Sequence, residues 1–286
     1  MASSLSSSNQ KVAVVTGSSS GIGYETSLTL ARNGFLTYAT MRNLNKSGNI
    51  KSVAYKEKLP LKIVQLDVTD DGSVKNAMQS IISEDSRLDV LVNNAGYPLN
   101  GAFEDLAMDE IKAQYETNLF GVIRATQAAL PLMRKQKSGI IVNISSGGVT
   151  LGGIPGGSAY VSTKFAVEGL SKSMAYELEP FGIKVVLVEP GVIRSDFVNN
   201  VVAAKKSQDP NSPYVQFMQN VAASLQHMLE GGSSADVVAK VVLKAVTSEN
   251  PSPKYLAGKD IEAWMEAKTS MSDEEFHNMV KQNMMK

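Results

Sequence analysis

Tyr160 and Lys164 are four residues apart in the stretch YVSTK, and their side-chain types are suited to proton transfer. On a helix, this spacing places both side chains on one face. A free tyrosine has a pKa of about 10 and is a weak base at neutral pH. A nearby ammonium group stabilises the phenolate and lowers that pKa. The pair could therefore give a proton to a carbonyl oxygen or take one from an alcohol.

A second group of candidate residues lies in the glycine-rich stretch VVTGSSSGIG, residues 14–23. The β-branched residues before it predict a strand ending at Thr16, and a helical pattern begins near Gly21. In such a turn, glycines allow tight bending, close approach of a phosphate and close helix–strand packing, while the helix N-terminus attracts anions. The strand–turn–helix context favours a dinucleotide site over a purely structural turn. The expected contacts are Gly17, Ser19, Ser20, Gly21, Ile22 and Gly23.

The residue after the second predicted strand indicates which dinucleotide binds. NAD-binding proteins usually carry an acidic residue about 20 positions after the glycines. This chain has Arg42 there, and a guanidinium group suits a 2′-phosphate. We therefore expect NADP(H) to be preferred, with NAD(H) as the alternative; a solvated surface arginine is the competing interpretation. After the third predicted strand, Asp67 and the adjoining Val68 are expected to meet the adenine.

The elements that must position these residues alternate along the chain. Runs rich in Val, Ile and Leu predict strands at 11–16, 36–41, 61–66, 88–93, 139–145, 183–190 and, more weakly, 253–258. Helical patterns lie near 21–33, 71–84, 107–135 and 158–179, and Pro131 is expected to bend or end the third. This order predicts an α/β protein with a Rossmann-type, doubly wound parallel sheet of about seven strands in three layers. The stretch 196–232 interrupts the alternation and is either a substrate lid or a surface insertion.

Composition limits the function classes. The chain has 286 residues and is 43% hydrophobic, which is ordinary for one α/β domain; we expect that domain at 11–286, with a C-terminal helical extension and a disordered tail at 1–10. Equal numbers of basic and acidic residues, 28 each, argue against a nucleic-acid partner. The absence of Cys, with only two His, argues against a metal site. No apolar run approaches the roughly 20 residues of a membrane span, and no targeting signal is evident, so we expect a cytoplasmic protein.

Six blocks of sequence occur in a characteristic order. They are TGSSSGIG (16–23), NNAG (93–96), Asn118 in YETNLFG, NISS (143–146), YVSTK (160–164) and EPGVIRS (189–195). In this combination the chain resembles the short-chain dehydrogenase/reductase family over residues 10–260. The stretches YATMRN and STKFAVEGL are similar to those of its hydroxysteroid and retinol dehydrogenase branch.

The resemblance implies a catalytic set. Tyr160 would be the general acid and base. Lys164 would lower the pKa of Tyr160, together with a positively charged nicotinamide, and would also bind the nicotinamide ribose. Ser146 would hold the substrate oxygen, and Asn118 would hold a water. Ser146 lies one residue farther from Tyr160 than in the family pattern, so Ser145 is the second candidate. The further cofactor contacts implied are Asn94, Ala95, Gly96, Pro190, Gly191, Ile193 and Ser195, the last in place of a threonine.

The expected function is that of an NADP(H)-dependent oxidoreductase that interconverts a carbonyl and an alcohol. An NAD-dependent alcohol or hydroxysteroid dehydrogenase and a non-catalytic dinucleotide sensor are the alternatives. The partner is expected to be an apolar small molecule, and the protein a homodimer or homotetramer. Residues expected to line an apolar pocket are Tyr97, Pro98, Val192, Phe197, Tyr214 and Met218.

Overall fold

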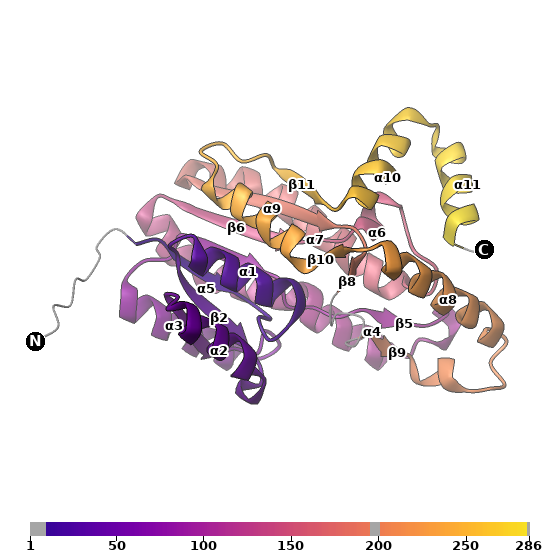
Figure 1. Ribbon diagram of the computed structural model, residues 1–286, viewed down its shortest axis with the longest axis horizontal. Helices are drawn as coiled ribbons and strands as arrows, with labels where there is room; N and C mark the ends of the chain where they lie inside the picture. The colour runs from indigo at the N-terminus through magenta and orange to yellow at the C-terminus, as the bar shows by residue number, and fades with distance from the viewer. Residues whose placement is uncertain (1–9, 195–200, 285–286) are drawn as a thin grey trace, which may run out of the picture.

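The computed structural model describes residues 10–194 and 201–284 (Figure 1). The predictions for the N-terminal tail at 1–9, for Ser195 and Phe197, and for the beginning of the lid concern residues outside this description.

The central sheet confirms the predicted fold class. Its seven strands are β1 (Val12–Val15), β2 (Leu36–Met41), β3 (Leu61–Gln65), β4 (Val90–Asn93), β6 (Gly139–Ile144), β7 (Ile183–Pro190) and β11 (Lys254–Ala257). They pair in the order β11-β7-β6-β4-β1-β2-β3, and every pair is parallel. All seven predicted strands are present within one or two residues of their predicted bounds.

Both faces of the sheet are covered, which explains why its strands are rich in apolar residues. In β1, Val12 and Val14 point to one face and pack in a core with helices α3 (Asp71–Asp85), α5 (Gly121–Gln136) and α7 (Ser158–Leu178). Ala13 and Val15 point to the other face, under α1 (Gly21–Arg32) and α9 (Ala235–Thr247). Figure 1 shows α1 and α9 side by side over the sheet. The helices α2 (Gly48–Glu57) and α9 were not among the predicted helical segments.

The predicted helix at 107–135 is divided at a place the sequence did not indicate. It consists of α4 (Met108–Tyr115), a π-helical turn (Glu116–Phe120) and α5. Pro131 does not end α5, which continues to Gln136. Pro131 has no N–H group, so the backbone carbonyl of Gln127 loses its helical hydrogen bond. Both residues are exposed, so water can bond to that carbonyl instead.

The remaining elements gather at the carboxyl ends of the strands (Figure 1). A short strand β5 (Leu99–Asn100) pairs with β9 (Val202–Ala203), and β8 (Ile193–Arg194) pairs with β10 (Ser233–Ser234). Helices α8 (Val215–Gly231), α10 (Lys259–Ser270) and α11 (Asp273–Met284) follow. The last two form the expected C-terminal helical extension.

Candidate active site

One cleft of about 970 Å³ opens where β1, β4, β6 and β7 end. Ligands of open parallel sheets bind at this edge, where the connections diverge to opposite faces. Sequence blocks far apart in the chain meet there. The cleft-lining residues that the sequence singled out are Gly17, Ser19, Ser20, Gly21, Ile22, Arg42, Asp67, Val68, Asn94, Ala95, Gly96, Tyr97, Pro98, Ser145, Ser146, Tyr160, Lys164, Pro190, Gly191, Val192 and Ile193.

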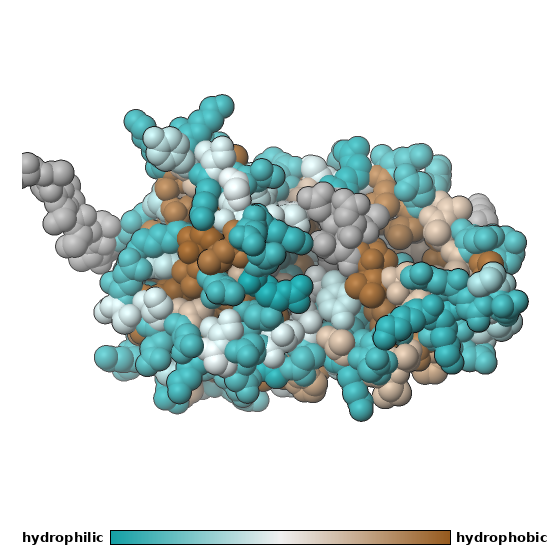
Figure 2. Space-filling model, turned by 90° about the horizontal axis from the view of Figure 1, so that it is seen from below, coloured by the Kyte–Doolittle hydropathy of each residue, from teal (hydrophilic) through white to brown (hydrophobic). Residues whose placement is uncertain are grey.

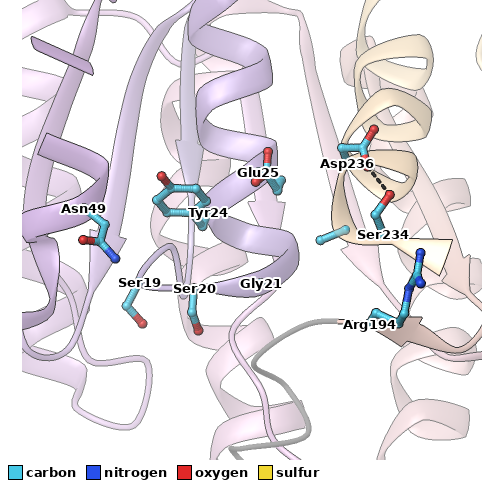
Figure 3. Close-up of a pocket in the computed structure, with 10 residues that line it drawn as sticks. Ser19, Ser20, Gly21, Tyr24, Glu25, Asn49, Arg194, Ser234 and Asp236 are labelled. Carbon is cyan, nitrogen blue, oxygen red and sulfur yellow. Dashed lines mark hydrogen bonds between the residues drawn. The ribbon is translucent and has the colours of Figure 1, made fainter. Parts of the chain in front are cut away.

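The glycine turn has the geometry of a phosphate cradle. Gly17 has φ +71°, and a Cβ there would lie 2.9 Å from Ala95 Cα. A Cβ on Gly23 would lie 2.3 Å from the Gly17 carbonyl oxygen, so Gly23 permits close packing behind the cleft and does not line it. Ser20 precedes α1 and its side chain makes no capping hydrogen bond to the first turn. Figure 3 shows this N-terminus facing an opening, with Arg194 across it. The donors of the first turn can therefore meet an anion.

The NNAG block supports the turn from behind. Asn94 Nδ2 donates to the carbonyl oxygens of Thr16 and Gly17, at 2.9 and 3.1 Å. The backbone N–H groups of Asn94 and Ala95 donate to Thr16 Oγ1 at 3.0 and 3.1 Å. The amide side chain of Asn94 is thus occupied in fixing the glycine turn.

Two cations also line the cleft. Arg42 follows β2 directly, and Lys46 is four residues farther along the chain. Asp67 Oδ1 accepts hydrogen bonds from the backbone N–H and hydroxyl of Thr69, at 3.0 and 2.7 Å. The carboxylate of Asp67 is therefore engaged locally, while Val68 lines the cleft beside it.

Tyr160 is buried on the first turns of α7, and its hydroxyl forms a side-chain hydrogen bond with Ser146. Burial raises the pKa of Tyr160 to about 12, and the hydrogen bond from Ser146 opposes that rise. The side chains of the protein therefore do not by themselves give the lowered tyrosine pKa expected from the sequence, because desolvation outweighs the other influences.

The two candidate serines have different partners. Ser146 begins the short helix α6 (Gly147–Thr150), and its Oγ accepts from Gly148 N at 3.2 Å. Ser145 is buried and its Oγ donates to Glu168 Oε1 at 2.9 Å. Of these two serines, Ser146 is therefore the one that bonds to Tyr160. The extra residue before Tyr160 is accommodated in α6 and the glycine-rich loop after it, where Gly152 and Gly156 have positive φ.

Lys164 lies one turn after Tyr160 and is equally buried. Its Nζ donates to the Ile144 carbonyl oxygen at 2.8 Å and lies 5.8 Å from the centre of the Tyr160 ring. Burial lowers the pKa of Lys164 to about 8. The side chain is therefore still a cation at neutral pH, next to the tyrosine.

Asn118 lies in the π-helical turn, fully buried and behind the cleft wall. Its Oδ1 accepts from Tyr97 N at 3.0 Å, while its Nδ2 donates to the Tyr97 carbonyl oxygen at 3.0 Å and to Thr163 Oγ1 at 3.2 Å. The π-turn, a feature common at functional sites, thereby connects the loop after β4 to helix α7. The water-holding role of Asn118 stays a prediction.

The family follows from a comparison with known proteins. The family model for short chain dehydrogenases matches residues 11–206. The chain is a short-chain dehydrogenase. This dehydrogenase is 38% identical over 256 residues to "Oxidoreductase BOA17" of Botryotinia fuckeliana, covering 87% of this chain and 89% of that protein. It is 35% identical to 17-beta-hydroxysteroid dehydrogenase type 1 of Homo sapiens, covering 84% and 76%.

Solved structures agree. A short-chain dehydrogenase from Streptomyces avermitilis is similar with a TM-score of 0.79 and 30% identity, covering 95% of this chain and 96% of that one. An alcohol dehydrogenase from Thermococcus sibiricus, solved with 5-hydroxy-NADP, is similar with a TM-score of 0.71 and 25% identity, covering 87% and 96%. Across residues 10–194 and 201–284 of the dehydrogenase, no helix combines the length and the apolar character needed to cross a membrane.

The sequence analysis missed part of one wall of the dehydrogenase's cleft. Tyr97, Pro98 and Val192 line it as expected, but Tyr214 and Met218 do not: the Tyr214 hydroxyl donates to Glu104 at the surface. The apolar wall also contains Leu151 and Ile154 from the loop after Ser146, and Val221, Leu225, Met228 and Leu229 from α8, within the predicted lid at 196–232. The part that was missed consists of Ile261, Trp264 and Met284 on α10 and α11. The apolar residues of α10 and α11 are the signal that could have indicated this, since they form a cluster with α8 and the loop after α6.

Proposed function

We propose that this dehydrogenase interconverts a carbonyl and an alcohol on an apolar small molecule, with NADP(H) as the preferred cofactor. The observation that carries the proposal is the Ser146–Tyr160 hydrogen bond beside Lys164, in the cleft that also contains the glycine turn. Ser146 can bond a substrate oxygen, and Tyr160 can donate its hydroxyl proton to that oxygen during reduction. Burial, which raises the pKa of Tyr160 to about 12, keeps it protonated for this task.

The residues present fit a dinucleotide cofactor. The glycine turn and the uncapped start of α1 suit a pyrophosphate, and Arg194 adds a cation across the opening (Figure 3). Arg42 and Lys46 would hold a 2′-phosphate on the adenosine ribose. Pro190, Gly191 and Ile193, with Lys164 and Ser195, would hold the nicotinamide half. When bound, the cofactor would supply or accept the hydride.

Lys164 assists the proton transfer of Tyr160. Its ammonium group, near the tyrosine ring, stabilises a phenolate in the direction of alcohol oxidation. The positive charge of an oxidised cofactor would act in the same direction. Asn118, bonded to α7 and to the loop after β4, keeps these two walls in register.

The substrate class follows from the wall opposite the glycine turn. That wall is built by aliphatic side chains and Trp264, which bind apolar surface and leave the orienting contacts to a few polar groups. The name of the human relative records activity on a hydroxysteroid, which is a large apolar alcohol. A bulky apolar ketone or aldehyde, or the corresponding alcohol, therefore fits this cleft best.

A panel of substrates with both cofactors tests the proposal. Oxidation of NADPH and NADH would be measured with steroidal, aromatic and aliphatic carbonyls. We expect turnover with at least one apolar carbonyl and a lower KM for NADPH. Faster reaction with NADH would favour the NAD-dependent alternative. Tight cofactor binding without turnover on any carbonyl or alcohol would favour the sensor.

Three further proposals concern the whole protein. We propose a cytoplasmic location and a single domain at 11–286. We also propose a homodimer or homotetramer, because Phe165 and Tyr176 lie three helical turns apart on α7 and are 47% and 80% exposed.

Figure 2 shows another feature of the surface: on the face seen there, apolar patches are separated by hydrophilic residues. The balanced charges give no support for a nucleic-acid partner.

A further inference from the structure

Two buried carboxyl groups lie directly behind the turn that carries Ser146. Glu168 is on α7, one turn after Lys164, and its side chain is 4% exposed. Glu189 is at the end of β7, and its side chain is fully buried. The two carboxyl groups are close together, since Lys254 Nζ lies 2.5 Å from Glu189 Oε1 and 3.8 Å from Glu168 Oε2. A hydrogen bond between two carboxyl groups requires that one of them carry a proton, because a carboxylate has no donor.

The pair holds the segment from Ser145 to Thr150 at both ends. Ser145 Oγ donates to Glu168 Oε1 at 2.9 Å. Thr150 Oγ1 donates to Glu189 Oε2 at 2.5 Å. Ser146 lies between these anchors and begins the helix that Thr150 ends. The position of the Ser146 hydroxyl therefore depends on the two carboxyl groups.

Three lysines face the pair or its anchors. Lys254 of β11 has its Nζ 2.5 Å from Glu189 Oε1 and 3.8 Å from Glu168 Oε2. Lys172 of α7, largely exposed, lies 3.5 Å from Glu168 Oε2. Lys268 of α10 donates to the Thr150 carbonyl oxygen at 2.7 Å. A pair with one shared proton carries one negative charge, which the half-buried Lys254 can balance.

We propose that Glu168 and Glu189 share one proton and act as positioning residues that hold Ser146 against Tyr160. The proposal rests on the proposed function for the role of Ser146, but the contacts themselves do not. Neither glutamate lines the cleft, so both act through the Ser145–Thr150 segment. The Glu168 contact also explains why Ser145 is not the serine bonded to Tyr160.

The electrostatics of the pair agree with a shared proton. Burial raises the pKa of Glu189 to about 7, the hydrogen bond to Glu168 adds to the rise, and Lys254 and Thr150 oppose it. Burial also works to raise the pKa of Glu168, but the hydrogen bonds from Glu189 and Ser145, with Lys254, lower it overall. We therefore assign the shared proton to Glu189 below neutral pH. Above it, two adjacent carboxylates repel each other and loosen the anchor.

A substrate-independent measurement tests the positioning. The protein is labelled with ¹³C at the tyrosine ring carbon that bears the hydroxyl, and its NMR spectrum is recorded. The resonance that disappears in Tyr160→Phe belongs to Tyr160. Ser146→Ala then shows how far this resonance moves when the hydrogen bond from Ser146 is lost. We expect Glu168→Ala to move the resonance in the same direction. Glu168→Gln, which can still accept from Ser145 and donate to Glu189, should restore it. Glu177→Ala, an exposed glutamate on the same helix, is the matched control. An unmoved resonance in a folded Glu168→Ala protein would overturn the proposal.

Infrared spectroscopy tests the shared proton. At pH 6 the wild type should show the carbonyl stretch of a protonated carboxylic acid, and Glu189→Gln should lack it. The absence of this band from the wild type would also overturn the proposal.

Kinetics separate this proposal from the proposed function. A displacement of about 1 Å can reduce a rate about 10²-fold, so Glu168→Ala should lower kcat at least about tenfold while the affinity for NADPH stays unchanged. Glu168→Ala combined with Ser145→Ala should cost no more than Glu168→Ala alone, because both act on one anchor. Additive losses would contradict this common route. A wild type that reduces no carbonyl but shows the expected resonance shifts would refute the proposed function and leave the positioning role supported.

Discussion

At the scale of single residues, Tyr160 decides whether the protein is an enzyme or a sensor. Tyr160→Phe keeps the ring but removes the ionisable hydroxyl. We expect turnover to fall by the factor of about 10²–10⁴ attributed to general acid–base catalysis. The affinity for NADPH and the melting temperature should change little. Steady-state kinetics and cofactor titration check this, and near wild-type turnover in the variant would remove the mechanism.

The two serines give a second residue-scale test. Ser146→Ala removes the hydroxyl bonded to Tyr160, and we expect turnover to fall by about 10²-fold, as for the loss of a donor to a developing oxyanion. Ser145→Ala removes only an anchor to Glu168, so its effect should be much smaller. The kcat of each variant, measured with one carbonyl substrate, decides the ranking. If Ser145→Ala were the more damaging, the catalytic role would pass to Ser145.

Arg42 provides the test of cofactor choice. A charge-assisted hydrogen bond to phosphate contributes about 1.5–3 kcal/mol. Arg42→Ala should therefore reduce the preference for NADPH over NADH by at least about tenfold. Calorimetric titration of wild type and variant with both cofactors measures the ratio, with Arg32→Ala as the control, since Arg32 is paired with Glu57 on the surface. Equal affinities of the wild type for both cofactors would refute the preference.

At the scale of elements, helix α10 reaches into the cofactor site through Asp260. Asp260 Oδ2 accepts from Val192 N at 2.6 Å, and a Cβ on Gly191 would lie 2.3 Å from the Asp260 carboxylate. Asp260→Ala should free the loop after β7 and weaken NADPH binding about tenfold, the scale of one hydrogen bond to a charged group. Asp260→Asn, which can still accept the bond, should retain most of the affinity. Fluorescence titration with NADPH measures the affinity of both variants. Equally weak NADPH binding in both would show that the negative charge of Asp260, and not its hydrogen bond to Val192, is what matters.

Elements differ in how far the sequence predicts them. The strands are short runs rich in apolar residues because both faces of the sheet are buried, and such runs are visible without a structure. The π-turn at Glu116–Phe120 contains no glycine or proline, so nothing in the sequence marks it. The apolar residues of α10 and α11 indicate that these helices pack on the protein, but only tertiary packing brings Trp264 and Met284 to the cleft.

The candidate site was predictable where function fixes a short local pattern, as in the glycine turn and the Tyr160–Lys164 pair. Glu168 and Glu189 belong to different elements, and no spacing rule connects them. Their interaction exists only because α7 packs on β7. The positioning of Ser146 could therefore not be predicted.

At the scale of the whole molecule, the buried carboxyl pair affects stability as a function of pH. The pKa of Glu189 is raised to about 7 in the folded protein from an ordinary value of 4.5. Between these values the folded state binds more protons than the unfolded state, so this group makes the free energy of unfolding fall as pH rises. One pKa unit corresponds to about 1.4 kcal/mol. We expect the wild type to lose at least about 1 kcal/mol more than Glu189→Gln between pH 5 and pH 7.5.

Urea denaturation of both proteins at the two pH values measures this difference. Ionisable groups remote from the pair contribute equally to both proteins, so the comparison isolates the Glu168–Glu189 pair. Identical pH dependence in wild type and Glu189→Gln would show that Glu189 is already ionised at pH 5.

Met284, at the end of α11, lines the same cleft as Gly17 near the start of the chain. During synthesis on a ribosome, the glycine turn and the first six strands of the sheet are therefore made well before the apolar wall is complete. Any polypeptide fused behind α11 would also begin beside the cleft. An affinity tag placed at the C-terminus would compete with an apolar ligand for access, whereas one placed before Gln10 would not, since β1 begins at the opposite edge of the sheet.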